Sequence, residues 1–69
     1  MKYYSIQEVS TDEAEHFFSA TSDSKAIQFA HNEVRKAKAR NNMPELKGVT
    51  FTWNVKCGTK VISTIETTL

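Results

Sequence analysis

The residue types that most often carry catalytic chemistry are few in this chain and form no recognisable motif. Cys57 is the only cysteine, and it falls in the apolar register of an alternating segment, where we expect a buried structural thiol rather than a nucleophile. His16 and His31 lie on different expected elements, without the paired Cys/His spacing of a zinc site. We therefore predict no enzymatic activity, no catalytic residues, no metal site and no cofactor.

A basic cluster near the end of the expected helix is the first candidate for binding. The net charge is only +1, but acidic residues concentrate in residues 1–24 and basic residues in residues 25–60. Such a cluster could contact nucleic-acid phosphates. Cations at a helix C-terminus are also stabilised by the macrodipole alone, and we favour this simpler interpretation. The cluster consists of Arg35, Lys36, Lys38, Arg40 and Lys47.

The sheet face that a single helix leaves uncovered is the second candidate. Aromatic and aliphatic side chains among threonines would make this surface half apolar. Such patches often mark protein contacts, whereas scattered surface hydrophobic residues are ordinary, and we give both interpretations equal weight. Stacking on RNA bases is a weaker option, because the aromatic motif of sheet-based RNA-binding modules is missing. The predicted face consists of Tyr3, Phe17, Thr50, Thr52, Asn54, Ile62 and Thr64.

Acidic side chains near the start of the chain form a third charged segment. A short polar stretch of this kind is usually solvated, and this is the interpretation that we favour. The alternative is a mimic of phosphate groups that docks on a basic partner. The segment consists of Glu8, Asp12, Glu13 and Glu15.

Two short strands are expected before the helix. The segment Lys2–Val9 is rich in Tyr, Ile and Val, which predicts a strand with Tyr4 facing the core. Polar residues at Ser10–Glu13 predict a turn. The segment Glu15–Ala20 predicts a second strand with Phe18 facing inward, although six residues do not separate a strand from a loop.

An amphipathic helix is expected over Ser24–Arg40. Ser22 or Asp23 can cap its first turn. Asn41–Asn42 suits its end, and Pro44 prevents its continuation. Three of the five positions on the apolar stripe are alanine, so the helix can approach the sheet closely. The stripe consists of Ala26, Ile27, Ala30, Val34 and Ala37.

The clearest pattern is a hairpin over Val49–Leu69. Its first half alternates strictly between apolar and polar residues, which predicts a strand with one buried face. Gly58–Thr59 is the expected turn. Continued alternation in Lys60–Thr68 places Val61 on the inner face and Ile62 on the outer face. The alternating apolar residues are Val49, Phe51, Trp53, Val55 and Cys57.

Together these elements predict one α+β domain over residues 1–69. Its antiparallel sheet has three to four strands, in the order β-β-α-β-β, or β-α-β-β if the second strand does not form, with one helix on one face. A domain this small buries only about 60% of its unfolded surface, so a partner protein or a homo-oligomer is expected. The lone cysteine and the lack of an export signal predict a cytoplasmic protein, with no membrane contact.

The overall organisation resembles small phage- or mobile-element-encoded inhibitors, including anti-CRISPR proteins. The likeness lies in the strand opening Lys-Tyr-Tyr-Ser-Ile-Gln-Glu-Val, the capped helix entry Ser-Ala-Thr-Ser-Asp-Ser-Lys-Ala-Ile, the terminal hairpin and the very small size. The resemblance implies inhibition through surface contact with a host protein or nucleoprotein complex. We therefore expect a protein-binding module, a phage-type inhibitor or accessory factor, with a nucleic-acid-binding module as the alternative.

A second resemblance is to dodecins, which are flavin-storing β-α-β-β proteins that assemble into shells. The helix followed by Leu-Lys-Gly-Val and a hairpin is similar to them. The chain departs from them in the long Ser10–Asp23 insert, the short hairpin and the inward register of Trp53. A flavin-binding oligomer is therefore the minor alternative.

Overall fold

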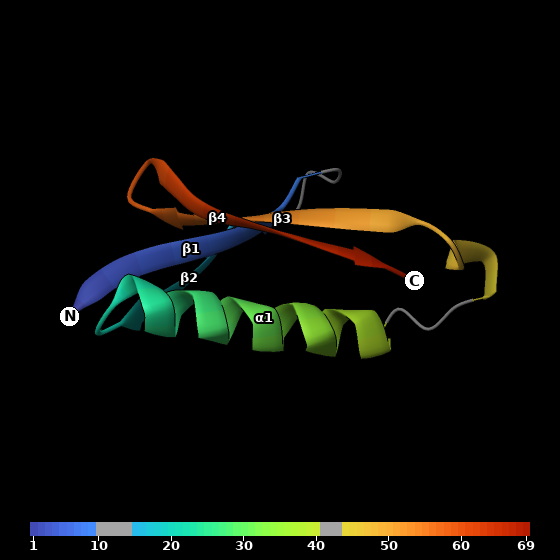
Figure 1. The fold of residues 1–69 in the computed structure, drawn as a ribbon, viewed down its shortest axis with the longest axis horizontal. Helices are drawn as coiled ribbons and strands as arrows, with labels where there is room; N and C mark the ends of the chain where they lie inside the picture. Colours follow the sequence, from blue (N-terminus) through green and yellow to red (C-terminus); the bar gives the residue numbers. More distant parts are fainter. Residues whose placement is uncertain (10–14, 41–43) are drawn as a thin grey trace.

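The computed structural model describes residues 1–9, 15–40 and 44–69, apart from the side chain of Leu46. It confirms the α+β class, the β-β-α-β-β order and an antiparallel sheet with one helix on one face (Figure 1). The second strand is present, so the chain departs from the β-α-β-β order of dodecins. The elements are β1 (Lys2–Glu8), β2 (His16–Ala20), α1 (Asp23–Arg40), the 3-10 turn η1 (Pro44–Leu46), β3 (Thr50–Cys57) and β4 (Lys60–Thr68).

The sheet has the strand order β2-β1-β3-β4, and every neighbouring pair is antiparallel. The N-terminal strand β1 is therefore internal and joins the β1/β2 pair to the β3/β4 hairpin. The segment Ser10–Glu13, where the sequence predicted a turn, lies outside the described residues. Gly58 opens the β3/β4 turn with a φ of +63°. A positive φ at the first of two turn residues is the pattern of a type II′ hairpin turn.

The helix α1 begins with a side-chain cap. The Ser22 hydroxyl accepts a hydrogen bond from the Lys25 N–H at 3.2 Å, which satisfies one of the unpaired N–H groups of the first turn. Asp23 takes a different role, because it accepts a 2.7 Å hydrogen bond from the Tyr4 hydroxyl of β1. This contact fixes the start of the helix against the sheet. The helix end predicted at Asn41–Asn42 lies outside the described residues.

The core lies between α1 and one face of the sheet. Ala26, Ala30 and Val34 are buried, as the helical period predicted. At the β2 side the rings of Tyr4, Phe18 and Phe29 stack in series, with centroid distances of 5.7 and 4.3 Å. Phe18, Trp53 and Ile62 pack against the central cluster. That cluster consists of Ile6, Ala30, Val34, Val55 and Ile65.

A β-bulge in β4 overturns one prediction about the sheet faces. Val55 pairs with Ser63 but the next residue, Lys56, pairs with Val61, so Ile62 is an extra residue on its strand. An extra residue shifts the alternation by one position. Ile62 therefore packs against the core, and Val61 is 45% exposed. The predictions that Ile62 faces outward and that Val61 faces inward are both wrong.

Glu8 contradicts the expectation that the acidic segment is solvated. Its exposure is only 5%, because it shares the inner face of β1 with Tyr4 and Ile6 and pairs in register with Trp53. Alternation along β1 imposes this position regardless of charge. Glu15 lies half-buried on the opposite side of the sheet, and the acidic residues between these two positions lie outside the described residues.

Candidate functional site

The outer face of the sheet, opposite α1, carries most of the residues predicted to contact a partner. Alternation from the buried positions of each strand places them there, and no described helix covers them (Figure 1). Ile62 is excluded by the bulge, and Val61 takes its place on this face. The predicted residues found there are Tyr3, Phe17, Thr50, Thr52, Asn54 and Thr64.

An aromatic pair, Tyr3 and Phe17, dominates one end of the outer face. Tyr3 is 79% exposed and Phe17 is 74% exposed. In the β1/β2 register Tyr3 lies opposite Ser19 and Phe17 lies opposite Ser5, so the two rings are diagonal neighbours on adjacent strands. Diagonal positions are within reach of aromatic side chains. The pair therefore forms one apolar surface, and Val61 lies further across the sheet.

An ion pair lies beside the aromatic pair on the outer face of the sheet. Lys56 of β3 lies 3.7 Å from Glu15, which comes just before β2, and both side chains are half-buried. Lys56 of β3 lies opposite Ser5 of β1, and Ser5 lies opposite Phe17 of β2. The ion pair therefore reaches across β1 from β3 to the start of β2. Ser5 is consequently only 3% exposed, although no other described element covers this face. Long side chains thus shield Ser5 from water.

The other end of the outer face is polar, and its side chains form hydrogen bonds with one another. The Thr64 hydroxyl donates to Asn54 Oδ1 at 3.1 Å, and the hydroxyls of Thr50 and Thr68 lie 2.9 Å apart. Cross-strand pairs of this kind stabilise a sheet. They offer no large apolar side chain to a partner. Tyr3 and Phe17 are therefore the exposed aromatic side chains of this face, whereas the other exposed apolar side chains of the strands and their ends include the valines Val9, Val49 and Val61.

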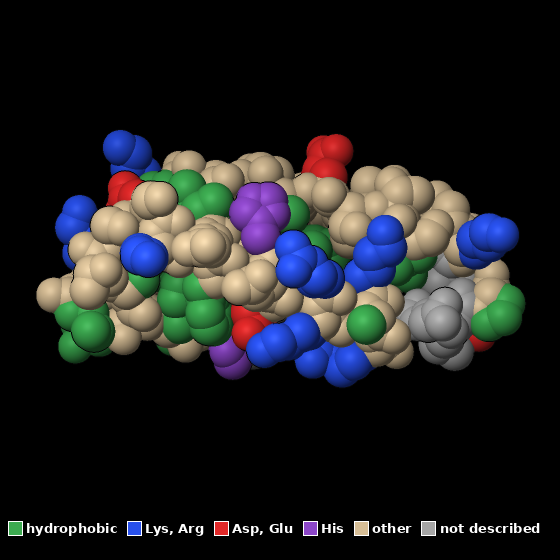
Figure 2. Space-filling model, turned by 60° about the horizontal axis from the view of Figure 1, so that its bottom comes forward, with side chains coloured by type: hydrophobic (Ala, Val, Ile, Leu, Met, Phe, Trp, Pro, Cys, Tyr) green, Lys and Arg blue, Asp and Glu red, His purple; other side chains and the backbone are tan. Residues whose placement is uncertain are grey.

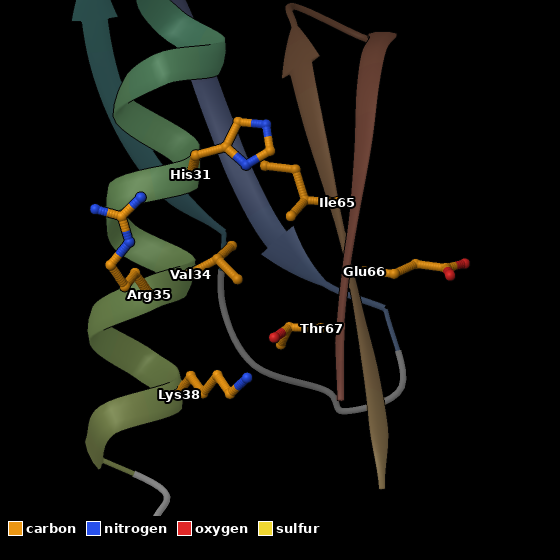
Figure 3. A pocket seen from close by; sticks show the side chains of 7 residues that line it. All are labelled: His31, Val34, Arg35, Lys38, Ile65, Glu66 and Thr67. Carbon is orange, nitrogen blue, oxygen red and sulfur yellow. The ribbon is translucent and has the colours of Figure 1, made fainter. Parts of the chain in front are cut away.

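A second candidate site is an open groove between α1 and β4, here called the α1–β4 groove. Its volume is about 260 Å³. In Figure 3 the side chains of His31 and Lys38 extend from the helix toward β4, the Arg35 guanidinium lies on the side of the helix away from β4, and Glu66 points away from the helix. Glu66 belongs to the outer register, so the charged side chain that extends across the groove is Lys38, with Arg35 at the helix edge of the lining. The lining residues are His31, Val34, Arg35, Lys38, Ile65, Glu66 and Thr67.

The predicted basic cluster is divided by this groove. Arg35 and Lys38 line it, whereas Lys36 lies 3.5 Å from Glu33 one helical turn earlier and is not part of the lining. Arg40 is exposed at the end of α1, and Lys47 is exposed beyond η1. Lys and Arg side chains gather over the helix side of the molecule in Figure 2. Sequence reasoning missed His31 and Thr67 as members of the groove.

A spacing signal could have found His31 but not Thr67. Residues 31, 35 and 38 follow the i, i+4, i+7 pattern that places side chains on one helix face. Thr67 belongs to β4, and only the tertiary packing brings it to this helix face. The groove could therefore be found only in part before the fold was known.

The residues with catalytic potential stay apart in the structure. Cys57 is half-buried on β3 and lies opposite Tyr4 and Lys60 in the two registers. His16 and His31 are exposed on β2 and α1. Within the described ranges, no three His, Cys, Asp or Glu side chains gather as metal ligands.

The surroundings of Tyr4 change its acidity. Burial, then the hydrogen bond to Asp23 and the charges of neighbouring groups, raise the pKa of Tyr4 to about 12. The phenol is therefore a structural donor rather than an acid near neutral pH.

No helix in the described part of the chain has the length and apolar character needed to cross a membrane. Comparisons with protein-family models, curated proteins and solved structures found no match.

Proposed function

We propose that this chain is a non-enzymatic protein-binding module whose contact surface centres on Tyr3 and Phe17. One observation carries the proposal: two aromatic side chains at diagonal positions of the β1/β2 pair are each about three-quarters exposed on a sheet face that no described element covers. Tyr and Phe are enriched at protein interfaces, where a few aromatic anchors supply most of the binding free energy.

The aromatic pair is also held on a rigid support. Tyr3 lies on β1, which is paired on both sides, and Phe17 lies on β2, whose other face stacks through Phe18 on the helix. A preorganised surface loses little conformational entropy when a partner binds. The partner is a protein with a complementary apolar surface, because the two rings carry no charge that would select a nucleic acid.

The narrower proposal is a phage-type inhibitor or accessory factor that acts on a host protein or nucleoprotein complex. Its support is the very small size and the organisation shared with small phage-encoded inhibitors. Such proteins act by covering a surface, and this chain offers one compact surface for that purpose.

The test compares the double variant Tyr3→Ala/Phe17→Ala with Thr52→Ala, a control on the polar part of the same face. Proteins retained from nuclease-treated lysate would be identified, purified and titrated by calorimetry against each variant. We expect the double variant to weaken binding by at least about 2 kcal/mol, and the control to bind like the wild type.

Two outcomes would count against this proposal. Equal affinity of the double variant and the wild type would remove the aromatic pair from the interface. Concentration-dependent dimerisation in sedimentation, abolished by the same double variant, would show that the surface binds a second copy instead. Circular dichroism must show an unchanged fold in both variants.

A further inference from the structure

We propose that the α1–β4 groove binds the phosphodiester backbone of a single-stranded nucleic acid. The groove lies on the helix side of the sheet, whereas Tyr3 and Phe17 lie on the opposite face. The proposal therefore concerns a second site, and it stands or falls independently of the protein contact proposed above.

The helix wall of the groove carries a row of three hydrogen-bonding side chains, of which Arg35 and Lys38 are cations. His31, Arg35 and Lys38 recur at i, i+4 and i+7, which separates them by roughly 6 and 4.5 Å along the helix axis. Arg can bind a phosphate with two parallel N–H donors, and Lys binds it as a point charge. A row of this kind fits an extended polyanion better than a single compact ion.

The charges of this row are not neutralised from within the described part of the chain. The structure pairs the nearby Glu33 with Lys36, which stands outside the groove. Glu66 belongs to the outer register and points away from the helix (Figure 3). Arg35 and Lys38 form no ion pair with a described carboxylate. Among the described residues, no carboxylate is therefore paired with Arg35 or Lys38 in competition with an anionic ligand.

The opposite wall suits the rest of a nucleotide chain. Thr67 contributes a hydroxyl that can donate to a phosphate or sugar oxygen, while Val34 and Ile65 supply an apolar floor. A basic groove that follows the backbone is the common feature of single-strand binders. The groove is open and has a volume of only about 260 Å³, which is too small to enclose a double helix.

The test uses two double variants that remove the same charge from the same helix. Arg35→Gln/Lys38→Gln changes the groove, and Lys36→Gln/Arg40→Gln changes cations outside its lining. A labelled single-stranded oligonucleotide of mixed sequence would be titrated with each protein, and binding followed by fluorescence anisotropy over a range of salt concentrations. Trp53 is the only tryptophan and lies opposite Ile65 in the sheet, so its emission gives a label-free readout.

We expect the groove variant to lose about tenfold or more in affinity and the matched variant to lose less than about threefold, since local contacts outweigh distant charges at moderate salt. The slope of log affinity against log salt concentration should fall by roughly 1.4 in the groove variant, because each lost phosphate contact on a single strand contributes about 0.7.

Three results would overturn the proposal. Equal losses in the two variants would show that general attraction to the basic helix, rather than the groove, is responsible. Equal affinity for a duplex of the same sequence, with the same response to both variants, would remove the single strand as the ligand. Displacement of the oligonucleotide by polyglutamate at equal charge concentration would identify an acidic-peptide site. Arg35 and Lys38 are exposed, and thermal melts would verify that both variants remain folded.

Discussion

Both faces of the sheet carry a tyrosine and a phenylalanine, but these side chains are exposed on the outer face and packed on the inner face. Tyr3 is 79% exposed on the outer face while its neighbour Tyr4 is 1% exposed on the inner face. Phe17 is likewise exposed, whereas Phe18 stacks between Tyr4 and Phe29. Strand alternation alone separates each adjacent pair. Adjacent identical residues can therefore serve stability on one face and recognition on the other, which makes each a natural control for its neighbour.

The two faces should differ most in how alanine substitutions at Phe17 and Phe18 change the free energy of unfolding. Phe18→Ala removes a ring stacked on two others, so we expect the free energy of unfolding to fall by about 3 kcal/mol. Phe17→Ala should change it by no more than about 0.5 kcal/mol, because the ring is exposed. Urea unfolding followed by circular dichroism measures both.

A domain of this size is marginally stable, so Phe18→Ala could prevent folding altogether. Phe18→Leu, with an expected cost of about half as much, keeps the comparison measurable. Similar losses at the two positions would mean that Phe17 is not on an open surface.

Substitutions at Tyr3 and Tyr4 should show an intermediate difference in the free energy of unfolding. Tyr4→Phe leaves the ring in place but removes the 2.7 Å hydrogen bond to Asp23. We expect a loss of about 1.5 kcal/mol in the free energy of unfolding, since the bond is partly buried and has a charged acceptor. Tyr3→Phe should have no measurable effect. If the two variants unfold at the same urea concentration, the Tyr4–Asp23 contact does not anchor the helix start.

The same contact predicts a dependence on alkaline pH. The folded protein holds the Tyr4 proton up to a pKa of about 12, above the ordinary tyrosine pKa of about 10 in the unfolded chain. Between these values the unfolded chain binds fewer protons than the folded protein, so stability falls as the pH rises. The contribution is fully present below pH 10 and lost by about pH 12. Unfolding curves across this window should be flatter for Tyr4→Phe than for the wild type, and equal slopes would contradict the shift.

The smallest expected difference concerns the third adjacent pair, Val61 and Ile62. The bulge turns Ile62 toward the core and Val61 toward solvent. Ile62→Thr should cost about 1 kcal/mol, because it removes apolar packing and places a hydroxyl against the core. Val61→Thr should lie within about 0.5 kcal/mol of the wild type. If Val61→Thr lowered the free energy of unfolding more than Ile62→Thr in thermal or urea unfolding, the result would contradict the bulge and would indicate regular alternation in β4.

Much of the fold was predictable because a period of two residues is a strong signal. This period correctly placed Tyr3 and Phe17 on the outer face and Tyr4 and Phe18 on the inner face. The helical period correctly predicted that Ala26, Ala30 and Val34 are buried. The bulge was not predictable, because the strand shows no glycine or other marker at Ile62. An extra residue in one strand follows from pairing with its neighbour, and no local composition encodes it.

The candidate sites were predictable to different extents. The outward positions of Tyr3 and Phe17 follow from alternation within two strands, but their diagonal placement became known only from the β1/β2 register. The α1–β4 groove needs Thr67 beside Arg35 and Lys38, and these residues belong to elements that only tertiary packing brings together. Strand order had the same difficulty, since nothing in the composition of β1 shows that its second partner is β3.

The internal position of β1 has a consequence for how the chain is made. β1 is synthesised before the other described strands, yet one of its edges must wait for β3, which follows the whole of α1. Long-range strand pairing of this kind slows folding. Until β3 leaves the ribosome, β1 presents an open hydrogen-bonding edge, and such edges can pair with other chains. The nascent protein is therefore most vulnerable to aggregation in the interval between its first strand and its third.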